Sequence, residues 1–245
     1  MTKPVRWIQA VKGVVFLSFF LMIATVTPAR ASTFDYLFGS SGGFNSTLTL
    51  TDSASNVTTY TTNTSAFFNN NQGWWSSVSA NGDTNDNWIV GVLGAGNYYH
   101  DYFTFDLSGL SATITAASLT TERAGATGTF PYTMWDVSTD AATLNNKAVS
   151  PNLAIFADLG SGNSYGTNLV GPGNYSDLLT FTLNAQGVAD INRAEGHFFS
   201  VGGCISNPNV DPTCGTTATP EPGTLMLLGT GLLGMGRIVR RKILG

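Results

Sequence analysis

The chain has 245 residues, of which 42% are hydrophobic and only 11% are charged, and its formal net charge is −4. This length suits one domain with terminal segments, and an acidic chain lacks the basic surface that nucleic-acid binding needs, so we expect no nucleic-acid partner. Most of the positive charge lies near the two ends. Residues 32–219 hold 3 basic and 14 acidic residues, a net charge of 3 − 14 = −11.

Residues 1–31 have the layout of a secretory signal peptide. Basic residues precede an apolar run over residues 13–26, and Ala29 and Ala31 then form a small-x-small site for signal peptidase. An N-terminal membrane anchor is the alternative, but the run of 14 apolar residues is short, since a spanning helix needs roughly 20. We therefore expect a signal helix, export, and cleavage after Ala31.

Residues 32–84 are biased in composition, and we expect an N-terminal arm or a set of edge strands. In STLTLT, Leu48 and Leu50 fall on one face of a strand and threonines on the other. Trp74 and Trp75 are adjacent, so on one strand their side chains point to opposite faces. Because flat aromatic rings stack on apolar C–H faces, one of these tryptophans is the candidate for carbohydrate contact.

The stretch DTNDN at residues 83–87 is the candidate metal site. Asp83, Asn85 and Asn87 would supply oxygen ligands at alternate positions, an arrangement that suits Ca²⁺. The segment does not match the rest of the EF-hand loop, because other residues occupy the positions where that loop requires Gly and Glu. A solvated turn is the alternative, and we expect no other cofactor.

Residues 85–206 are expected to form the core of an all-β domain, an antiparallel β-sandwich or jelly roll, because alternating residues are separated by Gly- and Asn-rich turns. A change of phase near Ala116 predicts a bulge or turn. One short helix is expected near residues 185–195, with Asn184 as its N-cap and Gly196 at its end. The predicted strands are DYFTFDL, SATITAASLTTE, YTMWDV, LAIFADL, LLTFTL and HFFSVGG.

The sequence carries no pattern typical of an enzyme. His100 and His197 are its only histidines, and the G-x-S-x-G motif is absent. No two carboxylates stand out as the pair that a glycoside hydrolase needs. We therefore expect a protein that is not an enzyme.

Residues 207–219 are expected to be a linker. Cys204 and Cys214 enclose a loop rich in Pro and Asn. Export places both cysteines in an oxidising compartment, which favours a disulfide between them. Two free thiols are the alternative.

Residues 220–245 have three parts: a Pro-Glu-Pro motif, an apolar run over residues 223–236, and a basic end. Positive charge stays on the cytoplasmic side of a membrane, so the apolar run is expected to be a transmembrane helix with residues 32–219 outside. The layout resembles the PEP-CTERM sorting signal. The residues that carry the resemblance are Pro220, Glu221, Pro222, Arg237, Arg240 and Arg241.

Residues 85–203 resemble secreted β-sandwich modules of the DNRLRE type, from NWIVG through NYYHDYFTFDLSGLSATITAASL. They are also similar to a group of PEP-CTERM proteins that share the elements YFTFDLSGL, TITAASL, FADLGSGNSYG, FTLNAQGVADIN and FFSVGG. This second resemblance implies an exported, jelly-roll-like domain. It implies no activity.

The resemblance to the sorting signal implies processing by exosortase, in addition to signal peptidase, in a Gram-negative bacterium that makes exopolysaccharide. The chain would be held in the membrane through its C-terminal segment and then reach the cell surface or the medium. We expect a surface or extracellular-matrix protein associated with exopolysaccharide. A carbohydrate-binding module is the first alternative, and a polysaccharide-active enzyme is the second.

Overall fold

The structure is a computed structural model, and it describes residues 34–39, 44–62, 71–81, 87–94, 96–174 and 177–216. The chain divides into the units Met1–Ala31 and Ser32–Gly245, and every described residue lies in the second. The predicted signal helix and the predicted C-terminal hydrophobic helix fall outside the described residues. Among the residues that are described, no helix is long and apolar enough to cross a membrane.

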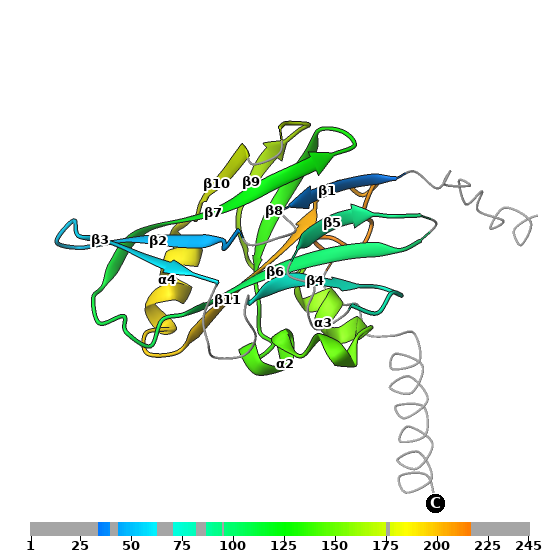
Figure 1. Ribbon diagram of the computed structural model, residues 1–245. Helices are drawn as coiled ribbons and strands as arrows, with labels where there is room; N and C mark the ends of the chain where they lie inside the picture. Colours follow the sequence, from blue (N-terminus) through cyan, green and yellow to red (C-terminus); the bar gives the residue numbers. More distant parts are fainter. Residues whose placement is uncertain are drawn as a thin grey trace, which may run out of the picture. The chain divides into compact units, whose positions relative to one another are not determined.

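The described body is an antiparallel β-sandwich, as the alternation of its residues predicts (Figure 1). The strands pair in the order β3-β2-β7-β1-β5-β6-β11-β8-β9, with β10 beside β7 and β4 beside β6. The strands are β1 (Asp35–Gly39), β2 (Thr47–Asp52), β3 (Val57–Thr61), β4 (Gln72–Ser76), β5 (Trp88–Val92), β6 (Tyr98–Asp106), β7 (Ile114–Ala126), β8 (Phe130–Asp136), β9 (Ser164–Val170), β10 (Asp177–Thr182) and β11 (Phe198–Ile205).

The sheet curls so that β2, β7 and β10 face β6, β8 and β11 across one hydrophobic core. Tyr132 of β8 meets Phe181 of β10 edge to face, with ring centroids 5.1 Å apart. Trp88 stacks on Tyr132 at 5.7 Å, and its indole N–H donates to the Glu122 carbonyl oxygen over 3.0 Å. These rings therefore join the two layers.

The alternation in β2 is confirmed, since Leu48 and Leu50 are fully buried while the threonines that alternate with them are half-buried. The predicted irregularity near Ala116 is also confirmed. Thr51 lies opposite Ala116, but Asp52 lies opposite Ile114, so β7 has one extra residue at this point. That count of two residues against one defines a β-bulge.

Helices cover the outer face of β6 and β4. They are α2 (Ala141–Asn145), the 3-10 turn η1 (Lys147–Val149) and α3 (Leu153–Asp158). The buried side chains between these helices and the strands are Trp75, Tyr102, Leu144, Ile155, Phe156 and Leu159. As a result the predicted strand at DYFTFDL, which lies almost entirely in β6, is buried on both faces.

The prediction of a strand at LAIFADL is wrong, because these residues form α3. The Asn152 side chain accepts hydrogen bonds from the backbone N–H groups of Ala154 and Ile155 and so caps the helix. A short apolar run has the same pattern in a buried strand and in a short helix. The sandwich consequently has α2, η1 and α3 in addition to the one helix that the sequence predicted.

That helix is α4 (Ala185–Arg193), and its N-cap is confirmed. The Asn184 side chain accepts from the backbone N–H groups of Gln186 and Gly187. Ile191 is fully buried against the core, and Gly196 lies beyond the last turn with a φ of +76°. The positive φ suits a glycine after a helix.

The expected division of the chain needs correction at two places. In the 32–84 segment, β1 lies between β5 and β7, and β2 lies between β3 and β7, so both are inner strands. Of the four strands described in this segment, β3 and β4 are the edge strands. In the expected linker, Val210 and Asp211 are buried, so its described part, residues 207–216, is packed on the domain.

Candidate functional site

The two adjacent tryptophans of β4 point to opposite faces, as expected. Trp75 has no exposed surface, and its indole N–H donates to the Leu144 carbonyl oxygen over 3.1 Å beneath α2. It therefore cannot meet a ligand. Trp74 is 9% exposed and faces outward into a shallow groove.

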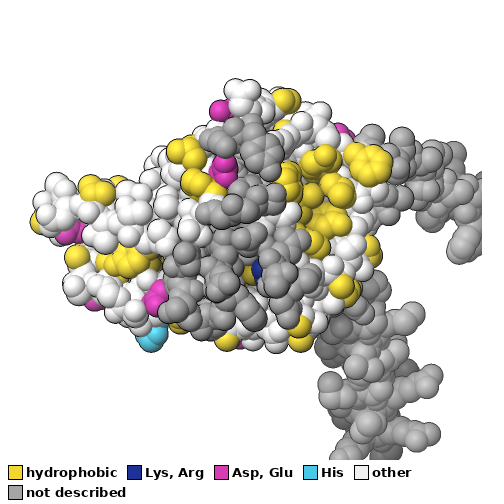
Figure 2. Space-filling model, viewed as in Figure 1, with side chains coloured by type: hydrophobic (Ala, Val, Ile, Leu, Met, Phe, Trp, Pro, Cys, Tyr) yellow, Lys and Arg dark blue, Asp and Glu magenta, His cyan; other side chains and the backbone are white. Residues whose placement is uncertain are grey.

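We call this depression the aromatic groove. It has a volume of about 360 Å³ and is formed mainly by β1, β4 and β5. Figure 2 shows hydrophobic side chains gathered over β1 and β5. The residues that line the groove are Tyr36, Phe38, Trp74, Asn87, Ile89, Leu93 and Tyr99.

Two buried rings form the base of the aromatic groove. Trp74 and Tyr99 meet edge to face with centroids 5.0 Å apart. The Trp74 indole N–H donates to Asn87 Oδ1 over 3.1 Å, and the Tyr99 hydroxyl accepts from Asn97 Nδ2 over 2.7 Å. These bonds fix the orientation of both rings, so the base of the groove is preorganised.

The more exposed rings come from β1. Tyr36 and Phe38 are half-buried, whereas Leu37 between them points into the core. The pairing register places Phe38 opposite Ile89 of β5. These two rings were not among the predicted contact residues, although the alternation in DYLFG places them on one face. Of the two candidate tryptophans, Trp74 lies at the base of the groove and Trp75 is not part of its lining.

Among the residues that the structure describes, the lining of the aromatic groove contains no carboxylate and no basic side chain. The three basic residues of the described body lie elsewhere. Lys147 is buried, Arg123 pairs with Asp177 over 2.7 Å, and Arg193 of α4 pairs with Asp190. The groove is therefore an uncharged, mostly apolar surface on an acidic domain.

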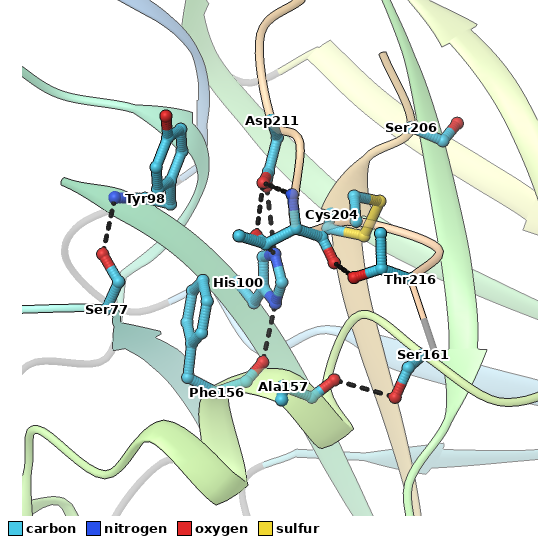
Figure 3. Close-up of polar contacts among 12 residues, drawn as sticks. Ser77, Tyr98, His100, Phe156, Ala157, Ser161, Cys204, Ser206, Asp211 and Thr216 are labelled. Atoms are coloured by element: carbon cyan, nitrogen blue, oxygen red, sulfur yellow. Dashed lines mark hydrogen bonds and ion pairs between the residues drawn. A yellow bond between two sulfur atoms is a disulfide. The ribbon is translucent and has the colours of Figure 1, made fainter. Parts of the chain in front are cut away.

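His100 lies in a fully buried polar cluster (Figure 3). Its Nδ1 is 2.7 Å from the Phe156 carbonyl oxygen, and its Nε2 is 3.0 Å from Asp211 Oδ2. The Thr213 hydroxyl also approaches Nε2, at 3.3 Å. In a hydrolytic triad the nucleophile and the carboxylate meet different ring nitrogens, so this arrangement differs from a triad. His197 is exposed and directly precedes β11.

Cys204 and Cys214 form a disulfide with Cα atoms 5.8 Å apart, the first of the two alternatives. Gly160 lies where a side chain would meet both His100 and the Cys204 sulfur. The disulfide and the His100–Asp211 contact thus hold the same segment, residues 205–216, against the sandwich.

The other predicted site residues are only partly described. Asp83 and Asn85 lie outside the described residues, and the side-chain oxygen of Asn87 accepts from Trp74. Within the described ranges, no three His, Cys, Asp or Glu side chains gather as metal ligands would. The cleavage residues Ala29 and Ala31 and the tail residues from Pro220 to Arg241 also fall outside the described ranges.

These features define a disulfide-bonded, all-β sandwich domain with an uncharged aromatic groove. Residues 218–242 match the PEP-CTERM protein-sorting motif, and the last described residue before them is Thr216. The chain is thus an exported, cell-surface-directed protein that exosortase sorts. No curated protein and no solved structure matches the chain, and the resemblance of its body to DNRLRE-type modules is not confirmed.

Proposed function

We propose that the body is a non-catalytic surface or matrix protein of a Gram-negative bacterium, which crosses the inner membrane and associates with exopolysaccharide. The match of residues 218–242 to the PEP-CTERM protein-sorting motif carries this proposal. The disulfide supports it, because such bonds persist in oxidising compartments outside the cytoplasm.

The proposal predicts that the mature protein lacks both apolar ends. Signal peptidase should cut after Ala31, and exosortase should cut close to Pro220-Glu221-Pro222. The 14-residue apolar run at 223–236 contains several glycines. It is short against the roughly 20 residues of a durable anchor, and glycine lowers helix stability. Intact-mass measurement of surface-extracted protein checks the prediction.

A variant with Arg237, Arg240 and Arg241 changed to Gln serves as the comparison. Losing the basic end removes the charge that fixes orientation, so this variant should keep its tail and fail to reach the surface fraction. A mature mass that still includes residues 225–245 in the unaltered protein would mean that the tail is a plain anchor. A body that remained cytoplasmic would refute export itself.

Carbohydrate binding by the body is a second candidate function, and the aromatic groove favours it. Preorganised rings in a shallow, uncharged depression can stack on the C–H face of a sugar. Enzymatic action on the same polysaccharide is the remaining alternative. Release of new reducing ends from a polysaccharide panel would support the enzyme and count against a non-catalytic body.

A further inference from the structure

We propose that the aromatic groove binds an uncharged glycan chain, that Tyr36 and Phe38 form its stacking platform, and that acidic polysaccharides are not its ligands. This inference rests on the carbohydrate-binding function proposed above and narrows it to one ligand chemistry and one strand. Tyr36 and Phe38 thereby replace Trp74 and Trp75 as the proposed primary contact residues.

The platform follows from the geometry of β1. Residues two apart on a strand share a face and lie about 6.6–6.8 Å apart along it. Tyr36 and Phe38 therefore present two rings in a row, with Trp74 and Tyr99 behind them. A row of rings suits an extended chain of sugar units lying along the strand. The groove volume of about 360 Å³ is near the lower end of ligand sites, which span roughly 300–1,000 Å³, so a short stretch of chain would fill it.

The preference for an uncharged glycan follows from the charged side chains of the body and their positions. An acidic glycan needs a cation to offset the desolvation of each carboxylate. The described lining of the groove offers no cation, and the three basic side chains of the body are buried or paired elsewhere. Asp35 of β1 directly precedes Tyr36 and adds a negative charge to the strand that carries both rings. A body with a net charge of 3 − 14 = −11 also repels polyanions at long range.

Within the described part of the lining, Asn87 supplies the one polar side chain besides the tyrosine hydroxyls. Its oxygen already accepts from Trp74. Few directional contacts therefore remain for individual sugar hydroxyls, and stacking supplies most of the recognition. We expect the groove to accept several neutral glycans that present a flat C–H face.

The test is affinity electrophoresis of surface-extracted protein in gels cast with single polysaccharides. Hydroxyethylcellulose and galactomannan are the neutral probes, and alginate and polygalacturonate are the acidic ones. We expect retardation by at least one neutral probe and none by the acidic probes. Phe38→Ala and Tyr36→Ala should each weaken binding by about 10-fold, since one ring contact contributes up to about 1.5 kcal/mol.

The matched control is Leu169→Ala, which removes an exposed apolar side chain on β9, outside the groove. It should leave retardation unchanged, and thermal unfolding of each variant confirms that it is folded. The groove assignment would be overturned if only the acidic probes retarded the protein, or if the Phe38→Ala and Leu169→Ala variants were retarded equally. Either result would still leave carbohydrate binding by the body supported. No retardation by any probe would instead refute the carbohydrate-binding function. Self-association that Phe38→Ala abolishes would identify a second copy of the chain as the occupant.

Discussion

Above about pH 5, the free energy of unfolding should fall as the pH rises, by about 1.4 kcal/mol per pH unit, until the pH reaches the pKa of Asp101 in the folded protein. Asp101 is fully buried in β6, and burial raises the pKa of its carboxyl well above the usual value. A hydrogen bond from the Tyr132 hydroxyl to Asp101 Oδ2 lowers this pKa, but burial has the larger effect.

The sign follows from proton counting. The unfolded chain loses the Asp101 proton near the ordinary pKa of about 3.9, whereas the folded chain keeps it to a higher pH because its pKa is raised. Within that window the folded state binds one more proton than the unfolded state, so each rise in pH favours unfolding. The loss ends once the folded carboxyl also ionises.

Asp101→Asn should remove this slope, because an amide does not titrate in the window. Urea unfolding from pH 5 to pH 9 measures the effect, and the variant should gain stability relative to the parent as the pH rises. Asp177→Asn is the contrasting control. Pairing with Arg123 lowers the pKa of Asp177, so its contribution is present above the unfolded pKa and lost as the pH falls. Equal slopes for the parent and Asp101→Asn would show that Asp101 ionises normally.

Local features of the fold could be predicted from the sequence because they depend on neighbours in the chain. Leu48 and Leu50 alternate within one strand, and Asn184 caps the helix that follows it directly. The sorting motif could be predicted for the same reason, because its Pro-Glu-Pro, apolar and basic parts follow one another within residues 220–245. Each of these signals lies within a short, continuous stretch of sequence.

Features that depend on distant pairing could not be predicted. Tyr36 becomes part of a groove only because β1 pairs with β5, where it lies opposite Gly91. Asp101 reads as one polar residue in an alternating strand, but helices and the opposite layer bury both faces of β6. The strand predicted at LAIFADL failed for a different reason, since nothing in its apolar pattern separates a strand from the helix that Asn152 caps.

Asp211→Ala should lower the free energy of unfolding by about 3–5 kcal/mol, the usual result of removing one member of a buried, hydrogen-bonded pair. Asp211 and His100 are both fully buried, and Asp211 Oδ2 lies within hydrogen-bond distance of His100 Nε2, at 3.0 Å. Without the carboxylate, Nε2 keeps only the longer contact with Thr213. Glu195→Ala, which removes an exposed carboxylate, should have little effect.

The disulfide should act on the same segment, so the two effects should not be independent. Replacing both Cys204 and Cys214 by Ala opens a loop with a sequence separation of 10, and loop entropy predicts a loss of about 2–3 kcal/mol. Once that loop is open, residues 205–216 can leave the sandwich and expose His100. In the protein without the disulfide, Asp211→Ala should then lower the free energy of unfolding by less than it does in the parent. The difference is the coupling energy, and we expect it within the range of about 0.5–3 kcal/mol that is seen for residues in contact or in one network. A double-mutant cycle by urea unfolding measures this coupling energy. Strictly additive losses would show that the disulfide and the buried pair stabilise this segment independently. The segment lies just before the sorting motif, which begins at residue 218.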